Sequence, residues 1–99
     1  MAYKIKWTEN AVEDMEHIMQ YLLDEWSHQN ATKFLEKVFY KIEIIKSLPF
    51  TGKQSAKKPG IRKILITKHC SIYYQLKEDV ITILDIFDHR QDPKKSIFE

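Results

Sequence analysis

The sequence predicts an α+β domain: an N-terminal strand and an antiparallel two-helix hairpin packed on a mainly antiparallel sheet, in the order β-α-α-β-β-β. In the first half of the chain, apolar residues recur every three or four positions, as on one face of a helix. In the second half, short apolar runs lie between turn residues, as in strands. Because the two patterns are segregated, we expect the helices to cover the sheet rather than alternate with its strands.

Size and composition indicate one globular domain over residues 1–99, since 43% of the residues are hydrophobic and 30% are charged. No apolar run approaches the roughly 18 residues that span a membrane, and the N-terminal residues lack the apolar core of a signal peptide. We therefore expect a cytoplasmic protein. The single cysteine, Cys70, excludes an internal disulfide and is expected to fill the core. Histidine and acidic residues lack metal-ligand spacing, so we expect no metal and no cofactor.

The first half of the chain predicts a strand and two helices. Residues 3–7 alternate between apolar side chains and lysine, which predicts a short strand with one wet face. Thr8 can cap the helix that follows, and Ser27 ends it and caps a second helix over about 28–48, which Pro49 terminates. Two helices of roughly 18 to 20 residues with so short a link are expected to form an antiparallel hairpin. The predicted apolar stripes are Ala11, Met15, Ile18, Leu22 and Trp26, and then Ala31, Leu35, Val38, Ile42 and Ile45.

The second half predicts a loop and three strands. Residues 49–60 are bounded by turn residues, and strands are predicted at about 61–67, 71–76 and 80–87. The last strand is apolar at nearly every position, so we expect it to be central and covered on both faces. We also expect an apolar groove between the helical hairpin and the sheet, which a partner would cover.

Charge is unevenly distributed along the chain. Residues 9–25 contain no lysine or arginine, whereas residues 53–68 contain no acid. A patch formed by the basic segment would favour an anionic partner, either a nucleic acid or an acidic protein segment. The net charge of only +2 argues against strong nonspecific DNA binding. The basic residues are Lys53, Lys57, Lys58, Arg62, Lys63 and Lys68.

A charged motif, Asp88-His89-Arg90, follows directly after the apolar last strand. The sheet behind a strand end fixes the side chains there, so a titratable base is placed beside a fixed cation. Such a pair suits phosphate chemistry. The alternative is that His89 and Arg90 only solvate the strand end.

Residues spread along almost the whole chain resemble one protein family. They are Trp7-Thr8, Ala11, Asp14, Ile18, Tyr21, Phe34, Leu48-Pro49, Gly52, Gly60-Ile61-Arg62, Tyr73-Tyr74, Ile86 and His89-Arg90-Gln91-Asp92-Pro93. In this order and spacing, the sequence resembles the RelE/ParE superfamily of growth-inhibiting toxins from bacterial type II toxin–antitoxin systems, often described as plasmid stabilisation proteins. The resemblance implies a cognate antitoxin that silences the toxin, through which the chain could also oligomerise.

The resemblance leaves the target open. ParE-like members inhibit DNA gyrase, whereas RelE-like members are metal-independent endoribonucleases that cleave mRNA on the ribosome with the substrate's own 2′-hydroxyl as nucleophile. The ending His89-Arg90-Gln91-Asp92-Pro93 is more similar to ParE-like members. A third alternative is an interaction module of the same fold that has lost toxicity.

For an RNA-cleaving toxin, the resemblance implies roles for specific residues. Arg62 and Arg90 match two arginines that hold the scissile phosphate, which a planar guanidinium grips with two hydrogen bonds. They would share one face only if the last strand pairs next to the strand of Arg62. His89 would be acid or base, and either Tyr73 or Tyr74, here Tyr74, would orient or donate a proton. Lys53, Lys57, Lys58 and Lys63 would bind backbone phosphates or the target.

Other observations weigh against catalysis. Counterparts for the full set of lysines and for the C-terminal tyrosine of RelE-like enzymes are missing. Arg62 would instead form a surface ion pair with Asp85 or Asp88, and His89 would cap the strand end. Ile97 and Phe98 are expected to cover a strand edge or groove.

Overall fold

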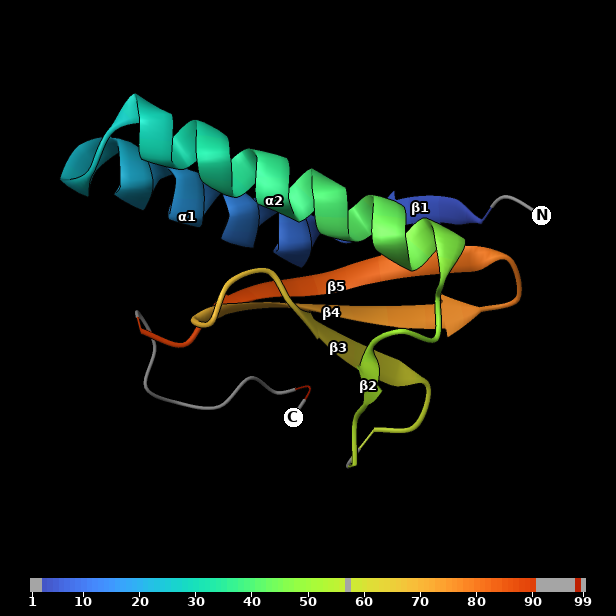
Figure 1. Cartoon of the computed structure of the whole chain (residues 1–99). Coiled ribbons are helices and arrows are strands. Elements are labelled where there is room, and N and C mark those ends of the chain that lie inside the picture. The colour runs from blue at the N-terminus through green and yellow to red at the C-terminus, as the bar shows by residue number, and fades with distance from the viewer. Residues whose placement is uncertain (1–2, 57, 91–97, 99) are drawn as a thin grey trace.

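A computed structural model describes residues 3–56, 58–90 and 98 of the chain. Two helices lie side by side over one face of a five-stranded sheet (Figure 1). The predicted α+β class, the helical hairpin and the mainly antiparallel sheet are confirmed. The elements are β1 (Lys4–Trp7), α1 (Glu9–Glu25), α2 (His28–Ser47), β2 (Lys53–Gln54), β3 (Ile61–Leu65), β4 (Cys70–Lys77) and β5 (Val80–Asp88).

The sheet has the order β1-β5-β4-β3-β2. β1 runs parallel to β5, and every other neighbouring pair is antiparallel. β5 is therefore an interior strand, as its apolar sequence predicts, although β4 occupies the middle of the sheet. The edge strand β2, which was not predicted, has only two residues and pairs with Lys63 and Arg62.

Both predicted helix caps are present. The Thr8 hydroxyl accepts a hydrogen bond from the Ala11 amide at 3.0 Å, and the Ser27 hydroxyl accepts one from the Asn30 amide at 3.1 Å. Each cap satisfies an amide that has no partner within its own helix. None of the helices in the described part of the chain is long and apolar enough to cross a membrane.

The core lies between the helices and the sheet. Cys70 is buried within it, as predicted. Trp26 departs from its predicted stripe, because 60% of its surface is exposed. It caps the C-terminal end of α1, where the hairpin projects beyond the strands (Figure 1). The core side chains include Ala11, Ile18, Val38, Ile42 and Ile45 from the helices and Ile72, Tyr74, Ile81, Ile83 and Ile86 from the sheet.

A β-bulge in β5 connects the sheet to the start of α1. Tyr73 pairs with Asp85 while Tyr74 pairs with Ile83, which leaves Leu84 as an extra residue. The Leu84 carbonyl accepts hydrogen bonds from the Thr8 hydroxyl at 3.3 Å and from the Asn10 side chain. The bulge thus anchors the first turn of the helix.

Two carboxyl groups meet beyond this bulge. Asp14 of α1 is hydrogen-bonded to Asp85 of β5, and its Oδ2 also accepts the Ile86 amide at 3.3 Å. Burial, followed by the hydrogen bond and the charge of Asp85, raises the pKa of Asp14 from 3.8 to about 7. Asp14 therefore keeps its proton at a pH well above that at which an ordinary aspartate loses it.

Candidate functional site

The structure places Arg62 and Arg90 at opposite ends of the sheet. Arg62 in β3 pairs with Tyr74, whereas Asp88, two residues before Arg90, pairs with Cys70. β4 lies between β3 and β5, so the last strand does not pair next to the strand of Arg62. With about 3.3 Å per residue along a strand, the two arginines are on the order of 20 Å apart. The two guanidinium groups are therefore not brought to one phosphate.

Arg62 and Tyr74 instead hold the turn that follows α2. The buried Tyr74 hydroxyl donates to the Pro49 carbonyl at 2.7 Å and accepts from the Gly52 amide at 3.0 Å. Arg62 donates to the Gly52 carbonyl at 2.7 Å and to the Phe50 carbonyl at 3.3 Å. Burial raises the pKa of Tyr74, so its hydroxyl keeps the proton that this geometry requires.

The supported turn displays two large apolar side chains. Leu48 is 63% exposed and Phe50 is 66% exposed. The Arg62 guanidinium lies 5.0 Å from the centre of the Phe50 ring, a cation–π contact that orients the ring. A pair of exposed apolar side chains on a turn fixed from behind is typical of a protein-binding surface.

At the end of β5, Arg90 forms an ion pair with Asp88. Its Nε and Nη2 donate to the two Asp88 carboxylate oxygens at 3.3 and 3.2 Å, and its backbone amide donates at 2.9 Å. Burial opposes ionisation of Asp88, but the hydrogen bonds and charge of Arg90 outweigh it and lower the pKa of Asp88. Asp88 thus carries a buried negative charge that fixes the arginine in place.

His89 lies on the other face of the sheet from Arg90. Its Nε2 is 3.2 Å from the Ser71 hydroxyl, and its ring meets the Phe87 ring edge-on at 4.9 Å. Ser71 and Phe87 are paired residues that point away from the helices, while Cys70 points into the core. The adjacent His89 and Arg90 therefore lie on opposite faces of the sheet, His89 on the face away from the helices and Arg90 on the helical side.

Two of the predicted lysines, Lys53 and Lys63, line a hollow of about 380 Å³ on the sheet face that the helices leave open, and Lys58 lies beside it. Lys63 lies 5.8 Å from the centre of the Tyr73 ring, and Lys58 lies 5.6 Å from that of Phe98. The two rings are 6.0 Å apart, so Phe98 covers part of this face, as predicted. Lys57 lies outside the described residues.

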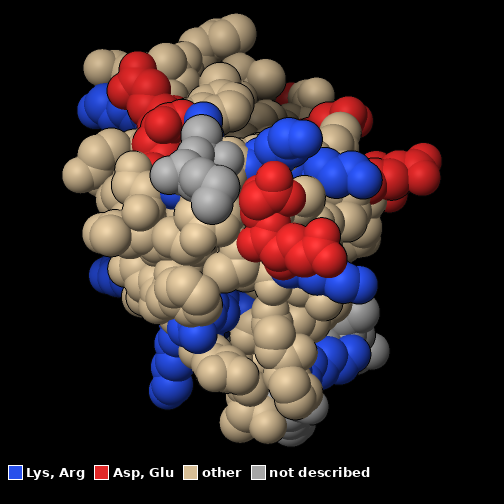
Figure 2. Space-filling model, turned by 90° about the vertical axis from the view of Figure 1, so that its right-hand side faces the viewer, with Lys and Arg blue, Asp and Glu red and all other residues tan. Residues whose placement is uncertain are grey.

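Figure 2 shows the surrounding charge from the end of the molecule where the turn after α2 lies. In the lowest part of this view, below the acidic residues near its centre and over β2, β3 and the segment between them, lysine and arginine are visible and aspartate and glutamate are not. The basic patch predicted from residues 53–68 is thus visible on this face.

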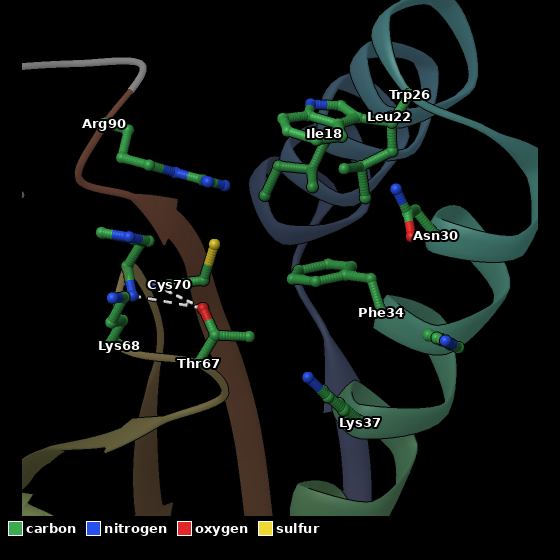
Figure 3. Close-up of a pocket in the computed structure, with 12 residues that line it drawn as sticks. Ile18, Leu22, Trp26, Asn30, Phe34, Lys37, Thr67, Lys68, Cys70 and Arg90 are labelled. Atoms are coloured by element: carbon green, nitrogen blue, oxygen red, sulfur yellow. Dashed lines mark hydrogen bonds between the residues drawn. The ribbon is translucent and has the colours of Figure 1, made fainter.

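A second cavity, of about 330 Å³, lies on the helical side of the sheet between the hairpin and the β3–β4 turn (Figure 3). The sequence predicts an apolar groove here, but it does not predict the cations around it. The i, i+4 spacing of Lys33 and Lys37 around Phe34 was the available signal. The lining residues are Ile18, Leu22, Trp26, Asn30, Lys33, Phe34, Lys37, Thr67, Lys68, His69, Cys70 and Arg90.

Metal ligands do not gather in the part of the chain that the structure describes: there, no group of three or more histidine, cysteine or acidic side chains could hold an ion. The residues that line both cavities place cations beside apolar or aromatic surfaces.

Residues 5–93 match the family described as "ParE toxin of type II toxin-antitoxin system, parDE". No curated protein sequence matches this chain. Solved structures with a similar fold include the chromosomal ParDE toxin–antitoxin system from P. aeruginosa, with 20% identity, a TM-score of 0.75, and coverage of 88% of this chain and 96% of that one.

Two further structures share the fold at lower similarity. The YoeB/ParE toxin from Agrobacterium tumefaciens has 18% identity and a TM-score of 0.64, with coverage of 87% of this chain and 98% of that one. A mutant of the E. coli toxin RelE in the free state has 15% identity and a TM-score of 0.64, with coverage of 94% and 90%. At these identities the likeness establishes the fold alone.

Proposed function

This chain belongs to the ParE toxin family of type II toxin–antitoxin systems, and on that premise we propose that it inhibits DNA gyrase by binding rather than by cleaving RNA. The observation that carries this proposal is the separation of Arg62 from Arg90, with β4 between their strands. General acid, general base and phosphate-binding cations must converge on one reacting group to cleave RNA. The arrangement of the two arginines supports a binding mode that needs no such convergence.

The partners of the four predicted catalytic residues support the same proposal. Arg62 and Tyr74 bind backbone groups of the turn at 49–52, and Arg90 binds Asp88. His89 lies against Ser71 on the open sheet face. Each of these side chains therefore contacts a different local part of the fold, and the four do not converge on one point.

A binding inhibitor instead needs large side chains displayed in a fixed geometry. The turn carrying Leu48 and Phe50 meets this requirement, because the side chains of Tyr74 and Arg62 hold its carbonyls and its Gly52 amide. We therefore assign this turn to the contact with gyrase.

The experiment that tests this function is induction of the chain in bacteria. Plasmid supercoiling, trapped gyrase–DNA complexes and mRNA ends mapped by primer extension are measured in the same cells. The expected result is trapped gyrase with intact mRNA. Ribosome-dependent mRNA breaks that vanish with Arg62→Ala and Arg90→Ala would overturn it. Normal growth with neither effect would leave an interaction module without toxicity.

The same proposal includes neutralisation by a cognate antitoxin. Family membership supports such a partner, and the apolar cleft beside α2 offers it a surface. Co-expression of the reading frame next to this gene is expected to restore growth and to co-purify with the chain. If the product of that reading frame neither restores growth nor co-purifies with the chain, it is not the antitoxin and this part of the proposal fails.

One observation favours the alternative, a RelE-like ribosome-dependent mRNA endoribonuclease. The hollow on the open sheet face combines lysines with the Tyr73 and Phe98 rings, and aromatic faces beside cations suit single-stranded nucleic acid. If this alternative holds, the primer-extension arm detects cleavage, and Lys63→Ala weakens it.

A further inference from the structure

The sheet has one face that the helices leave open (Figure 1), and four of the five strands place lysines on it. Ile5 and Trp7 of β1 pack on the core, so the lysines on either side of Ile5 point to the opposite face. Ile64 of β3 and Leu76 of β4 also pack on the core, which places the lysine next to each of them on the open face. The β3 lysine pairs with one of β2. The five lysines of the open face are Lys4, Lys6, Lys53, Lys63 and Lys77.

Acidic side chains are concentrated in the other layer of the molecule. Helix α1 contains six aspartates and glutamates and no lysine or arginine. The five strands contain two acids, Asp85 and Asp88, and both are buried, with Asp14 and Arg90 as their respective partners. The net charge of +2 therefore understates the positive potential of the open face, because positive and negative charges lie in different layers.

The lysines of the open face form two groups. Lys4 and Lys77 both pair with the first residue of β5, and Lys6 lies two residues further along β1. Lys53 and Lys63 are paired with each other on β2 and β3. With about 4.8 Å between strands and about 3.3 Å per residue along them, the two groups are on the order of 15 Å apart.

This spacing favours a double-stranded nucleic acid as the ligand. The two phosphate backbones of B-form DNA flank a major groove about 12 Å wide, which the long, jointed side chains of two lysine groups can span. A single strand offers only one row of phosphates to such a face. Exposed lysines are suited to backbone phosphates, because these contacts depend on charge and not on the base sequence.

We propose that the open face of the sheet binds the backbone of duplex DNA, and that the toxin thereby contacts the DNA that gyrase holds. The second half of this statement rests on the proposed function. The displayed turn adjoins the open face: Tyr3, which precedes Lys4, lines a groove with Phe50, and Lys53 directly follows Gly52. One molecule can therefore contact the enzyme through the turn and its DNA through the lysines.

The free chain is expected to bind DNA weakly and with a strong dependence on salt. Nonspecific contacts of this kind have dissociation constants of about 10⁻⁴ to 10⁻⁶ M at physiological salt. The logarithm of the association constant should fall with the logarithm of the salt concentration with a slope of about −4.5, since each of five phosphate contacts contributes about −0.9. On gyrase the same contact becomes stronger, because the turn already holds the toxin beside the DNA.

The test is a titration of labelled nucleic acids with the full chain, followed by fluorescence anisotropy. A duplex of about 20 base pairs is compared with single-stranded RNA of the same sequence, between about 50 and 200 mM salt. We expect the duplex to bind more tightly, and a second duplex of unrelated sequence to bind equally well. Tighter binding of the single-stranded RNA would overturn the proposal and favour the ribonuclease alternative.

Charge removal on β1 tests the assignment of the face. Lys4→Gln/Lys6→Gln is expected to weaken duplex binding roughly tenfold at low salt and to reduce the salt slope by about 2. Lys4→Arg/Lys6→Arg should restore both, since a phosphate contact needs only the charge. Lys33→Gln/Lys37→Gln removes the same charge at exposed positions on the helical side and should change neither. Equal weakening by the two glutamine pairs would show an effect of net charge alone and overturn the proposal.

The anisotropy assay contains no gyrase, so this inference and the proposed function fail separately. In cells, Lys4→Gln/Lys6→Gln should reduce the trapped gyrase–DNA complexes, while capture of gyrase without DNA stays unchanged because the turn is intact. A chain that binds the duplex but traps no gyrase sinks only the proposed function. A chain that traps gyrase, binds no duplex and is unaffected by Lys4→Gln/Lys6→Gln sinks only this inference.

Discussion

The Tyr74 hydroxyl donates a 2.7 Å hydrogen bond to the Pro49 carbonyl, 25 residues earlier in the chain. The same oxygen accepts the Gly52 amide. One buried phenol thus fixes both ends of the turn that displays Phe50.

Tyr74→Phe is expected to lower the free energy of unfolding by about 1–3 kcal/mol, because it leaves a carbonyl and an amide without their partner. Urea denaturation measures the loss. Tyr40→Phe, at an exposed position on α2, should change the stability by less than about 0.5 kcal/mol. Equal effects at the two positions would contradict the role assigned to the phenol.

Gly52→Ala should destabilise the fold by about 1–3 kcal/mol through overpacking. A Cβ at Gly52 would lie 2.6 Å from the Tyr74 oxygen and 3.0 Å from the Lys63 carbonyl. The cost should shrink in a Tyr74→Phe background, where the closest atom is gone, and a double-mutant cycle measures this coupling. Gly60→Ala has open space around it, and its expected cost of about 1 kcal/mol comes from a φ of 87°.

Stability should fall as the pH rises from about 4 to about 7, owing to Asp14. Its pKa is about 7 in the fold and 3.8 as the reference value, so between these values the folded state binds more protons than the unfolded state. The stabilising proton is present at low pH and is lost through the folded pKa. Asp14→Asn should flatten this slope and be more stable than the native chain at pH 8. Urea titrations at pH 5 and pH 8 test this, with Asp24→Asn on the exposed side of α1 as the control that keeps the slope.

Phe50→Ala should reduce growth inhibition at least tenfold in inducer response, because it removes the displayed ring and leaves the supporting hydrogen bonds in place. His89→Ala should keep full toxicity, since a binding inhibitor needs no acid or base. Phe39→Ala, at another exposed phenylalanine, is the control for the loss of an aromatic side chain. Toxicity lost with His89→Ala but kept with Phe50→Ala would reverse the assignment of the surface.

The helices and the three C-terminal strands of this fold can be predicted from local sequence patterns. Thr8 and Ser27 predict the starts of the two helices, and the observed helices begin one residue after each. The three C-terminal strands lie within two residues of their predicted bounds. Local periodicity does not report pairing, so the parallel contact between β1 and β5 and the bulge at Leu84 were not predicted.

The candidate site was less predictable, because it depends on which polar side chains already form hydrogen bonds within the tertiary fold. The sequence identifies Arg62 and Tyr74 as residues that could bind phosphate or transfer a proton. It does not show that both side chains are hydrogen-bonded to backbone groups of residues 49–52. It likewise groups His89 with Arg90, which strand geometry assigns to opposite faces. The sequence alone does not single out Lys33 and Lys37, because a lysine pair on a helix usually belongs to a solvated surface.

The pairing of β1 with β5 also constrains the order in which parts of the chain can fold. The Thr8 hydroxyl that caps α1 donates to the Leu84 carbonyl 76 residues later, so the pairing of the first strand and the attachment of the first helix to the sheet both require β5. Contacts between such distant residues close late in folding. A nascent chain, or a fragment broken off before residue 80, cannot assemble the sheet that supports the displayed turn. The complete sheet, and with it the displayed turn, can therefore form only after synthesis has passed the last strand.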